Sequence, residues 1–260
     1  MSIKTLLAGL GLAAVGMGAV TADAASVPQA YSRREWIQST GNQYIKIDYW
    51  HTATTRVELA CHIPKPTSGS YPVMFGSRNA NAGSCAYYFA ARFFGANCAM
   101  FCLTGNEGRQ NTTTHLYDED IIIRTDGATK TATWENASGE GGSVTTTGTA
   151  GNGLCSGNLF WLNKATTKDG LSLDDGGSTY KLYSMKIYEG ETLVCDLVPA
   201  VRRLDEVAGV YDLQRDCFFA NGKPENPFKV GDPYAGDLAA VLTVPADTTV
   251  DGIHPLQGAS

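Results

Sequence analysis

The sequence has little charge and lacks the pattern of a long helix. Lys, Arg, Asp and Glu make up 18% of the 260 residues, below the roughly 25% that is usual for globular proteins. Runs rich in Glu, Lys and Ala are missing, and beyond residue 20 no apolar stretch reaches the roughly 20 residues that a membrane-spanning helix needs. These absences exclude a helical bundle and a multi-span membrane protein.

Common catalytic and metal-binding motifs are absent as well. No glutamate begins a Glu-x-Asp-x-x-Glu pattern, which would place three carboxylates of a glycosidase on one face of a strand. The chain has four histidines but no Gly-x-Ser-x-Gly elbow around a nucleophilic serine. No Cys-x-x-Cys pair begins a structural zinc site. We therefore expect no catalytic residues and no enzyme activity. A glycoside hydrolase is the least favoured of the functions considered.

The charge balance also limits the partners. The net charge is −6 and the pI is near 5.2, whereas nucleic acids and anionic membranes are bound by basic surfaces. We therefore expect no nucleic-acid partner.

The N-terminal segment has the features of a secretory signal peptide. Lys4 precedes an apolar run over residues 6–20, and Ala-Asp-Ala at 22–24 supplies the small-residue cleavage pattern. We expect residues 1–24 to be removed and the mature chain to be secreted, periplasmic or at the cell surface, with no membrane insertion after cleavage. The alternatives are a membrane anchor or a buried helix, for which this Gly- and Ala-rich run is short.

The remainder of the chain is rich in glycine and in short alternating patterns. There are 29 glycines, and polar and apolar residues alternate as in half-buried strands. The clearest strands are expected at 45–49, 56–63, 143–147 and 158–162, and hairpins at 87–94 with 98–103, 121–124 with 128–134, 182–188 with 193–198, and 207–213 with 217–220. Many short strands separated by Gly, Asn and Asp predict an all-β sandwich or jelly roll.

Seven cysteines are many for a reduced protein, and in an exported chain they predict one or two disulfides besides buried thiols. The connectivity stays open, except that Cys98 and Cys102 are disfavoured as a pair. They lie four residues apart on one expected strand, so their Cα atoms would be about 13 Å apart, beyond the ~7 Å limit for a disulfide.

Five stretches together resemble a known family. They are Trp36–Ile45 (WIQSTGNQYI), Leu182–Tyr188 (LYSMKIY), Leu197–Arg203 (LVPAVRR), Gly209–Leu213 (GVYDL) and Phe218–Gly222 (FFANG). In this order they resemble the LamG-like domain of bacterial surface and phage-associated proteins. The resemblance implies an all-β, two-sheet antiparallel β-sandwich of the concanavalin A-like jelly-roll type, over about residues 34–229.

The chain is thereby divided into four expected segments. Residues 1–24 form the signal peptide, 25–33 a leader, 34–229 the LamG-like domain, and 230–260 an acidic tail or linker. The last segment contains no Lys or Arg after residue 230. Its alternative is one extra strand around residues 241–244.

Aromatic residues at strand ends are the candidates for carbohydrate binding, because rings cover the apolar face of a sugar and nearby amides fix its orientation. Tyr49 and Trp50 end the first long strand, and Trp134 and Asn136 end another. Packing within the core is an equally good interpretation of both tryptophans.

A Gly-rich loop carries the candidate metal ligands. Asp169, Asp174 and Asp175 lie on it with Asn163 nearby, and hard oxygen ligands of this kind suit Ca²⁺. The alternative is an Asp-Asp-Gly-Gly turn without metal. No other cofactor is expected.

These observations favour a secreted, non-catalytic binding module that recognises carbohydrate or another cell-surface component. A structural or adhesive surface domain that binds protein is the alternative. The scaffold alone does not decide between them, because one fold serves many functions.

Overall fold

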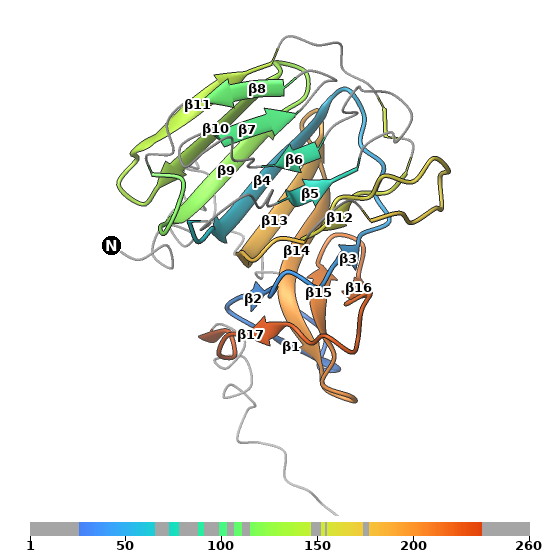
Figure 1. Ribbon diagram of the computed structural model, residues 1–260. Coiled ribbons are helices and arrows are strands. Elements are labelled where there is room, and N and C mark those ends of the chain that lie inside the picture. Colours follow the sequence, from blue (N-terminus) through green and yellow to red (C-terminus); the bar gives the residue numbers. More distant parts are fainter. Residues whose placement is uncertain are drawn as a thin grey trace, which may run out of the picture.

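The computed structural model describes residues 26–65, 73–77, 115–146, 152–153, 155–173 and 177–235, and the backbones of strands 88–90, 99–102 and 107–110. Almost all regular structure in these residues is β, and two antiparallel sheets lie face to face (Figure 1). The sequence-based prediction of an all-β antiparallel sandwich is confirmed. No helix within the described ranges has the length and apolarity needed to cross a membrane.

The large sheet has eleven strands, eight of which follow the order β11-β10-β9-β4-β13-β14-β15-β16, while β1, β2 and β17 pair beside that path. Its strands are β1 (Tyr31–Arg33), β2 (Ile37–Gln38), β4 (Thr55–His62), β9 (Asp120–Asp126), β10 (Thr131–Asn136), β11 (Gly141–Thr145), β13 (Lys181–Glu189), β14 (Thr192–Arg202), β15 (Ala208–Asp212), β16 (Cys217–Ala220) and β17 (Lys229–Val230).

The small sheet has six strands in the order β3-β12-β5-β6-β7-β8. They are β3 (Ile45–Lys46), β12 (Asn158–Leu159), β5 (Val73–Gly76), β6 (Tyr88–Ala90), β7 (Ala99–Cys102) and β8 (Glu107–Gln110). The expected hairpin around residues 87–103 is present as β6 and β7, which pair through Tyr88 and Cys102. The strand expected at 158–162 is shorter and ends at Leu159.

Two hairpins of the large sheet have residues that favour tight turns at their connections. Between β9 and β10, the Asp126 carboxylate accepts the backbone N–H groups of Ala128 and Thr129, which is how Asp stabilises a tight turn. Between β13 and β14, Gly190 has a φ of 57°, a left-handed conformation that glycine adopts without steric cost. Both turns lie where the sequence predicts them.

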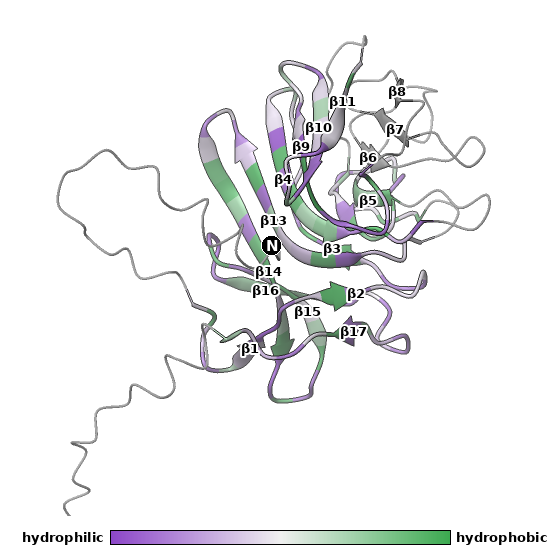
Figure 2. Ribbon diagram, turned by 90° about the vertical axis from the view of Figure 1, so that its left-hand side faces the viewer, coloured by the Kyte–Doolittle hydropathy of each residue, from purple (hydrophilic) through white to green (hydrophobic). Residues whose placement is uncertain are grey.

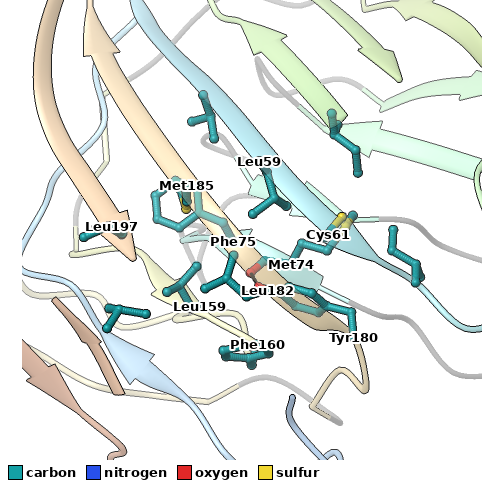
Figure 3. Close-up of a cluster of buried hydrophobic side chains, with 14 of the residues drawn as sticks. Leu59, Cys61, Met74, Phe75, Leu159, Phe160, Tyr180, Leu182, Met185 and Leu197 are labelled. Atoms are coloured by element: carbon teal, nitrogen blue, oxygen red, sulfur yellow. Dashed lines mark hydrogen bonds between the residues drawn. The ribbon is translucent and has the colours of Figure 1, made fainter. Parts of the chain in front are cut away.

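Alternation along the strands builds the core between the sheets. In β4, Val57, Leu59 and Cys61 are buried at 2% exposure or less, while Arg56, Glu58 and His62 are partly exposed. Figure 2 shows this alternation as bands along the long strands. In Figure 3, Leu59 and Met185 from the large sheet approach Phe75 and Leu159 from the small sheet. Each such side chain contributes about 1.5–3 kcal/mol when fully buried.

The two ends of the described chain lie together. Strand β17 pairs with β2 through Lys229 opposite Gln38 and Val230 opposite Ile37, and Pro233 forms an isolated bridge with Arg34. The expected leader also contributes, because β1 pairs with β14 over Tyr31–Arg33. The folded unit therefore includes residues on both sides of the segment 34–229.

The four cysteines whose side chains are described, Cys61, Cys155, Cys195 and Cys217, are free thiols. Burial raises the pKa of Cys61 and of Cys195, the latter to about 12, so these thiols are protonated and unreactive at neutral pH. The side chains of Cys85, Cys98 and Cys102 lie outside the described part. The disulfide expectation finds no support among the described thiols.

Candidate functional site

Strand register aligns polar side chains in two rows on the outer face of the large sheet. The first row runs across four strands, and its members are Tyr188, Arg56, Asp126 and Thr131. The second row comprises Asp196, Lys186, Glu58, Arg124 and Thr133. Directly opposed residues in an antiparallel sheet project to the same side. We call these two rows the polar face.

Alternating charges on the polar face form ion pairs. Arg124 Nε donates to Glu58 Oε2 at 3.0 Å, and the other side of its guanidinium donates to Glu135. Lys186 Nζ lies 3.6 Å from Asp196 Oδ2. Burial lowers the pKa of Arg124, but its bonds to Glu135 and Glu58 outweigh that effect and raise it. Arg124 is therefore fixed as a cation between two carboxylates.

A depression of about 260 Å³ lies on this face at the end near the β9–β10 turn. It is lined by Arg56, Val57, Glu58, Arg124, Thr125, Asp126, Thr131, Thr133 and Tyr188. The Arg56 guanidinium lies 5.4 Å from the centroid of the Tyr188 ring and donates to Glu191 Oε1 at 2.6 Å. An aromatic ring, charged groups and threonine hydroxyls thus converge on one hollow.

These charges contribute little to stability. The paired side chains of Arg124 and Glu58 are 34% and 36% exposed, and solvent-exposed ion pairs stabilise a fold by about 0–1 kcal/mol. Their hydrogen-bonding capacity is accessible to a ligand. The polar face therefore contributes little to holding the sheet together.

The loop before β4 is fixed at the same end of the sandwich by Glu189. Its carboxylate accepts hydrogen bonds from the hydroxyls of Thr55 (2.6 Å) and Thr54 (3.1 Å), and from those of Thr52 and Tyr49. Burial raises the pKa of Glu189, but these bonds outweigh burial and lower it. Tyr49, a sequence-based candidate for sugar binding, is 9% exposed and positions this loop instead.

Trp50, on the same loop, is half-buried, so part of its ring is exposed, as a sugar-binding aromatic residue requires. Its indole N–H donates to the carbonyl of Lys168 at 3.0 Å, and the Lys168 ammonium lies 5.2 Å from the ring centroid. The fold thereby brings two of the candidate regions together, because Asp169 follows Lys168 and is exposed. The lysine over the ring makes this tryptophan a less open platform than the sequence suggests.

The second pair of aromatic-site candidates is buried. Trp134 is 2% exposed and belongs to the core, so its interpretation as an exposed sugar platform gives way to the packing alternative. Asn136 is 9% exposed, donates to Glu119 Oε2 at 2.6 Å and accepts the backbone N–H of Ser138. Both side chains point inward because they occupy the same alternating positions of β10 as the buried Ala132.

The expected calcium loop is only partly described. Asp174 and Asp175 lie outside the described residues, and Asp169 is exposed. Asn163 is fully buried, and its amide bonds the carbonyls of Ser156 and Gly170. No group of three His, Cys, Asp or Glu side chains suited to a metal occurs in the described ranges. Calcium binding stays a prediction.

Sequence reasoning missed the polar face, although a signal for it was present. The polar positions of β4, Arg56 and Glu58, alternate with the core positions, which predicts that they project outward. Nothing in the sequence shows that Arg124, Tyr188 and Lys186 lie opposite them, because that depends on register between strands more than sixty residues apart.

Comparison with protein-family models found no match, and neither did a search of curated proteins.

Proposed function

We propose that this chain is an exported, non-catalytic binding module of the LamG-like, concanavalin A-type jelly-roll class that recognises carbohydrate on its polar face. The observation that carries the proposal is the depression in which Tyr188 lies beside Arg56, Glu58 and Arg124. The resemblance of the five motif stretches and the sandwich fold are consistent with it.

The chemistry of the depression fits a sugar better than a purely apolar ligand. A tyrosine ring offers a surface for the apolar face of a pyranose. Carboxylates accept hydrogen bonds from sugar hydroxyls, and guanidinium groups donate to their oxygens. Arg124 is already fixed between Glu58 and Glu135, so it loses little side-chain entropy on binding.

A protein ligand is the second candidate function, as in an adhesive surface domain. The alternation of Asp196, Lys186, Glu58 and Arg124 along one row favours it, because complementary charge rows set the register of a protein partner.

A glycan array with the mature chain tests the proposal. We expect binding with a dissociation constant between about 1 mM and tens of micromolar, which corresponds to roughly −4 to −6 kcal/mol. Tyr188→Ala should remove that binding. Tyr183→Ala is the matched control, because Tyr183 lies on the same strand but outside the lining of the depression. Equal binding by wild type and Tyr188→Ala would move the site elsewhere, with Trp50 tested next.

Export and calcium binding are tested with the same preparation. Expressed with its signal peptide, the protein should leave the cytoplasm with Ala25 as its first residue, and recovery of Met1 in the exported product would contradict the signal peptide. If Asp169, Asp174 and Asp175 hold Ca²⁺, the melting temperature should rise on adding Ca²⁺ and fall with a chelator.

A further inference from the structure

The depression on the polar face is lined by four charged side chains whose signs alternate in both directions of the sheet. Arg56 and Glu58 occupy alternate positions of β4, and Asp126 and Arg124 occupy alternate positions of β9. Register places Arg56 opposite Asp126 and Glu58 opposite Arg124. Neighbouring strands are about 4.8 Å apart, and alternate residues of one strand are about 7 Å apart. Each charge therefore has an opposite charge beside it both across and along the strands.

The two opposed pairs differ in how their charges are satisfied. Arg124 Nε donates directly to Glu58 Oε2 at 3.0 Å. Within the described residues, Arg56 and Asp126 do not form such an ion pair with each other. Arg56 instead donates to Glu191 Oε1 at 2.6 Å, and the Asp126 carboxylate accepts N–H groups of the turn after β9. The structure thus holds a cation and an anion apart on one hollow that both of them line.

The present partner of Arg56 is easily replaced. The side chain of Glu191 is 93% exposed and that of Arg56 is 37% exposed, and ion pairs exposed in this way are weak. Glu191 does not line the depression, so a carboxylate bound there can take its place on the guanidinium. Both turn N–H groups bond Oδ1 of Asp126, and among the described residues its second oxygen keeps its capacity to accept a donor.

We propose that the depression binds a zwitterionic part of a glycan, which carries an amine and a carboxylate on the same or on neighbouring sugar rings. This inference rests on the carbohydrate-binding function proposed above. The ligand carboxylate pairs with Arg56 and displaces Glu191, and the ligand ammonium donates to Asp126 Oδ2. The Tyr188 ring, which lies beside the Arg56 guanidinium, contacts the apolar face of the sugar.

Charge complementarity favours this ligand over the two other classes of glycan. A glycan with carboxylates alone would meet Glu58 and Asp126 beside the cations and would approach a chain whose net charge is −6, and like charges brought together are unfavourable. A neutral sugar would displace water from Arg56 and Asp126 without bringing an opposite charge to either group. A zwitterion has no net charge and supplies a partner to both.

A glycan array with matched disaccharides tests the proposal. The reference probe joins glucosamine to glucuronate, and its partners are the N-acetylated form, which lacks the ammonium, and the carboxyl-reduced form, which lacks the carboxylate. We expect the mature wild-type chain to bind the zwitterionic probe about threefold to fivefold more tightly than either modified form, as a partly exposed ion pair allows.

Three variants assign the two charges. Asp126→Asn retains an oxygen for the turn and should remove the preference for the free amine, while the preference for the carboxylate remains. Arg56→Gln should have the converse effect. Glu191→Gln should tighten the binding of both glucuronate-containing probes, because it removes the carboxylate that competes for Arg56, and it should leave the carboxyl-reduced probe unaffected.

The outcomes separate this inference from the proposed function on which it rests. Equal affinity for all three probes, lost together in Tyr188→Ala, would overturn the zwitterionic ligand and leave carbohydrate binding in place. Weaker binding of the glucuronate-containing probes by Glu191→Gln would also overturn it, because Glu191 would then support the ligand rather than compete with it. Failure to bind any glycan on the array would reject the proposed function, and the zwitterionic ligand with it.

Discussion

The two faces of the large sheet are built from the same strands and differ in what they contribute. On β4, Leu59 points into the core at 0% exposure, whereas its neighbour Glu58 points outward with a side chain that is 36% exposed. Inner-face side chains stabilise the fold because their apolar surface is removed from water. Outer-face charges form ion pairs that remain solvated and contribute little to stability. One strand therefore carries stability on one face and, in the function that we propose, recognition chemistry on the other.

The inner face should show the largest effect on stability. We expect Trp134→Ala to lower the free energy of unfolding by about 3–5 kcal/mol, because removing a large buried ring leaves a cavity. Chemical denaturation measures this change. Trp50→Ala is the control, since Trp50 is half-buried and should cost far less. Comparable losses in both variants would mean that Trp50 also belongs to the core.

How far the sequence predicts these features depends on whether they are local. Alternation over residues 56–63 and the turn at Asp126 are local, and both correctly predict the structure. Alternation along β10 sets the face to which Trp134 points, but how closely it is covered depends on pairing, because Gly142 lies opposite it at a distance that leaves no room for a side chain. The position of Tyr188 beside Arg56 depends in the same way on register.

The effect on stability that we expect from changing Glu189 is intermediate between the effects expected for the inner and outer faces. Four hydroxyl groups donate to its carboxylate, and Glu189→Gln should lower the free energy of unfolding by about 1.5–3 kcal/mol, the range for hydrogen bonds to charged groups. The direction in which this stability changes with pH follows from the lowered pKa of Glu189 in the folded state. This stability is fully present above the ordinary value of 4.5 and is lost as pH falls through the folded-state pKa.

Unfolding measured from pH 7 down to pH 3 tests this expectation. The difference in stability between wild type and Glu189→Gln should shrink as pH falls, because the wild-type carboxylate becomes protonated. Glu191→Gln is a matched control on the same turn, since Glu191 is 93% exposed and pairs with Arg56 at the surface. A constant difference across the pH range would show that the Glu189 charge does not fix this loop.

The outer face should show the smallest effect on stability and the largest on binding. Glu58→Gln keeps the shape of the side chain but removes the charge opposite Arg124, and we expect it to change the free energy of unfolding by no more than about 1 kcal/mol. Ligand affinity should fall measurably, because the carboxylate lines the depression and its hydrogen-bonding capacity is accessible there. Titration calorimetry with a glycan identified on the array measures the change in affinity, and denaturation measures the change in stability.

Lys186→Gln is the control, because Lys186 belongs to the same row but does not line the depression. A loss of stability well above 1 kcal/mol with unchanged affinity would reverse the division between the faces, since the charge row would then hold the sheet rather than recognise a ligand.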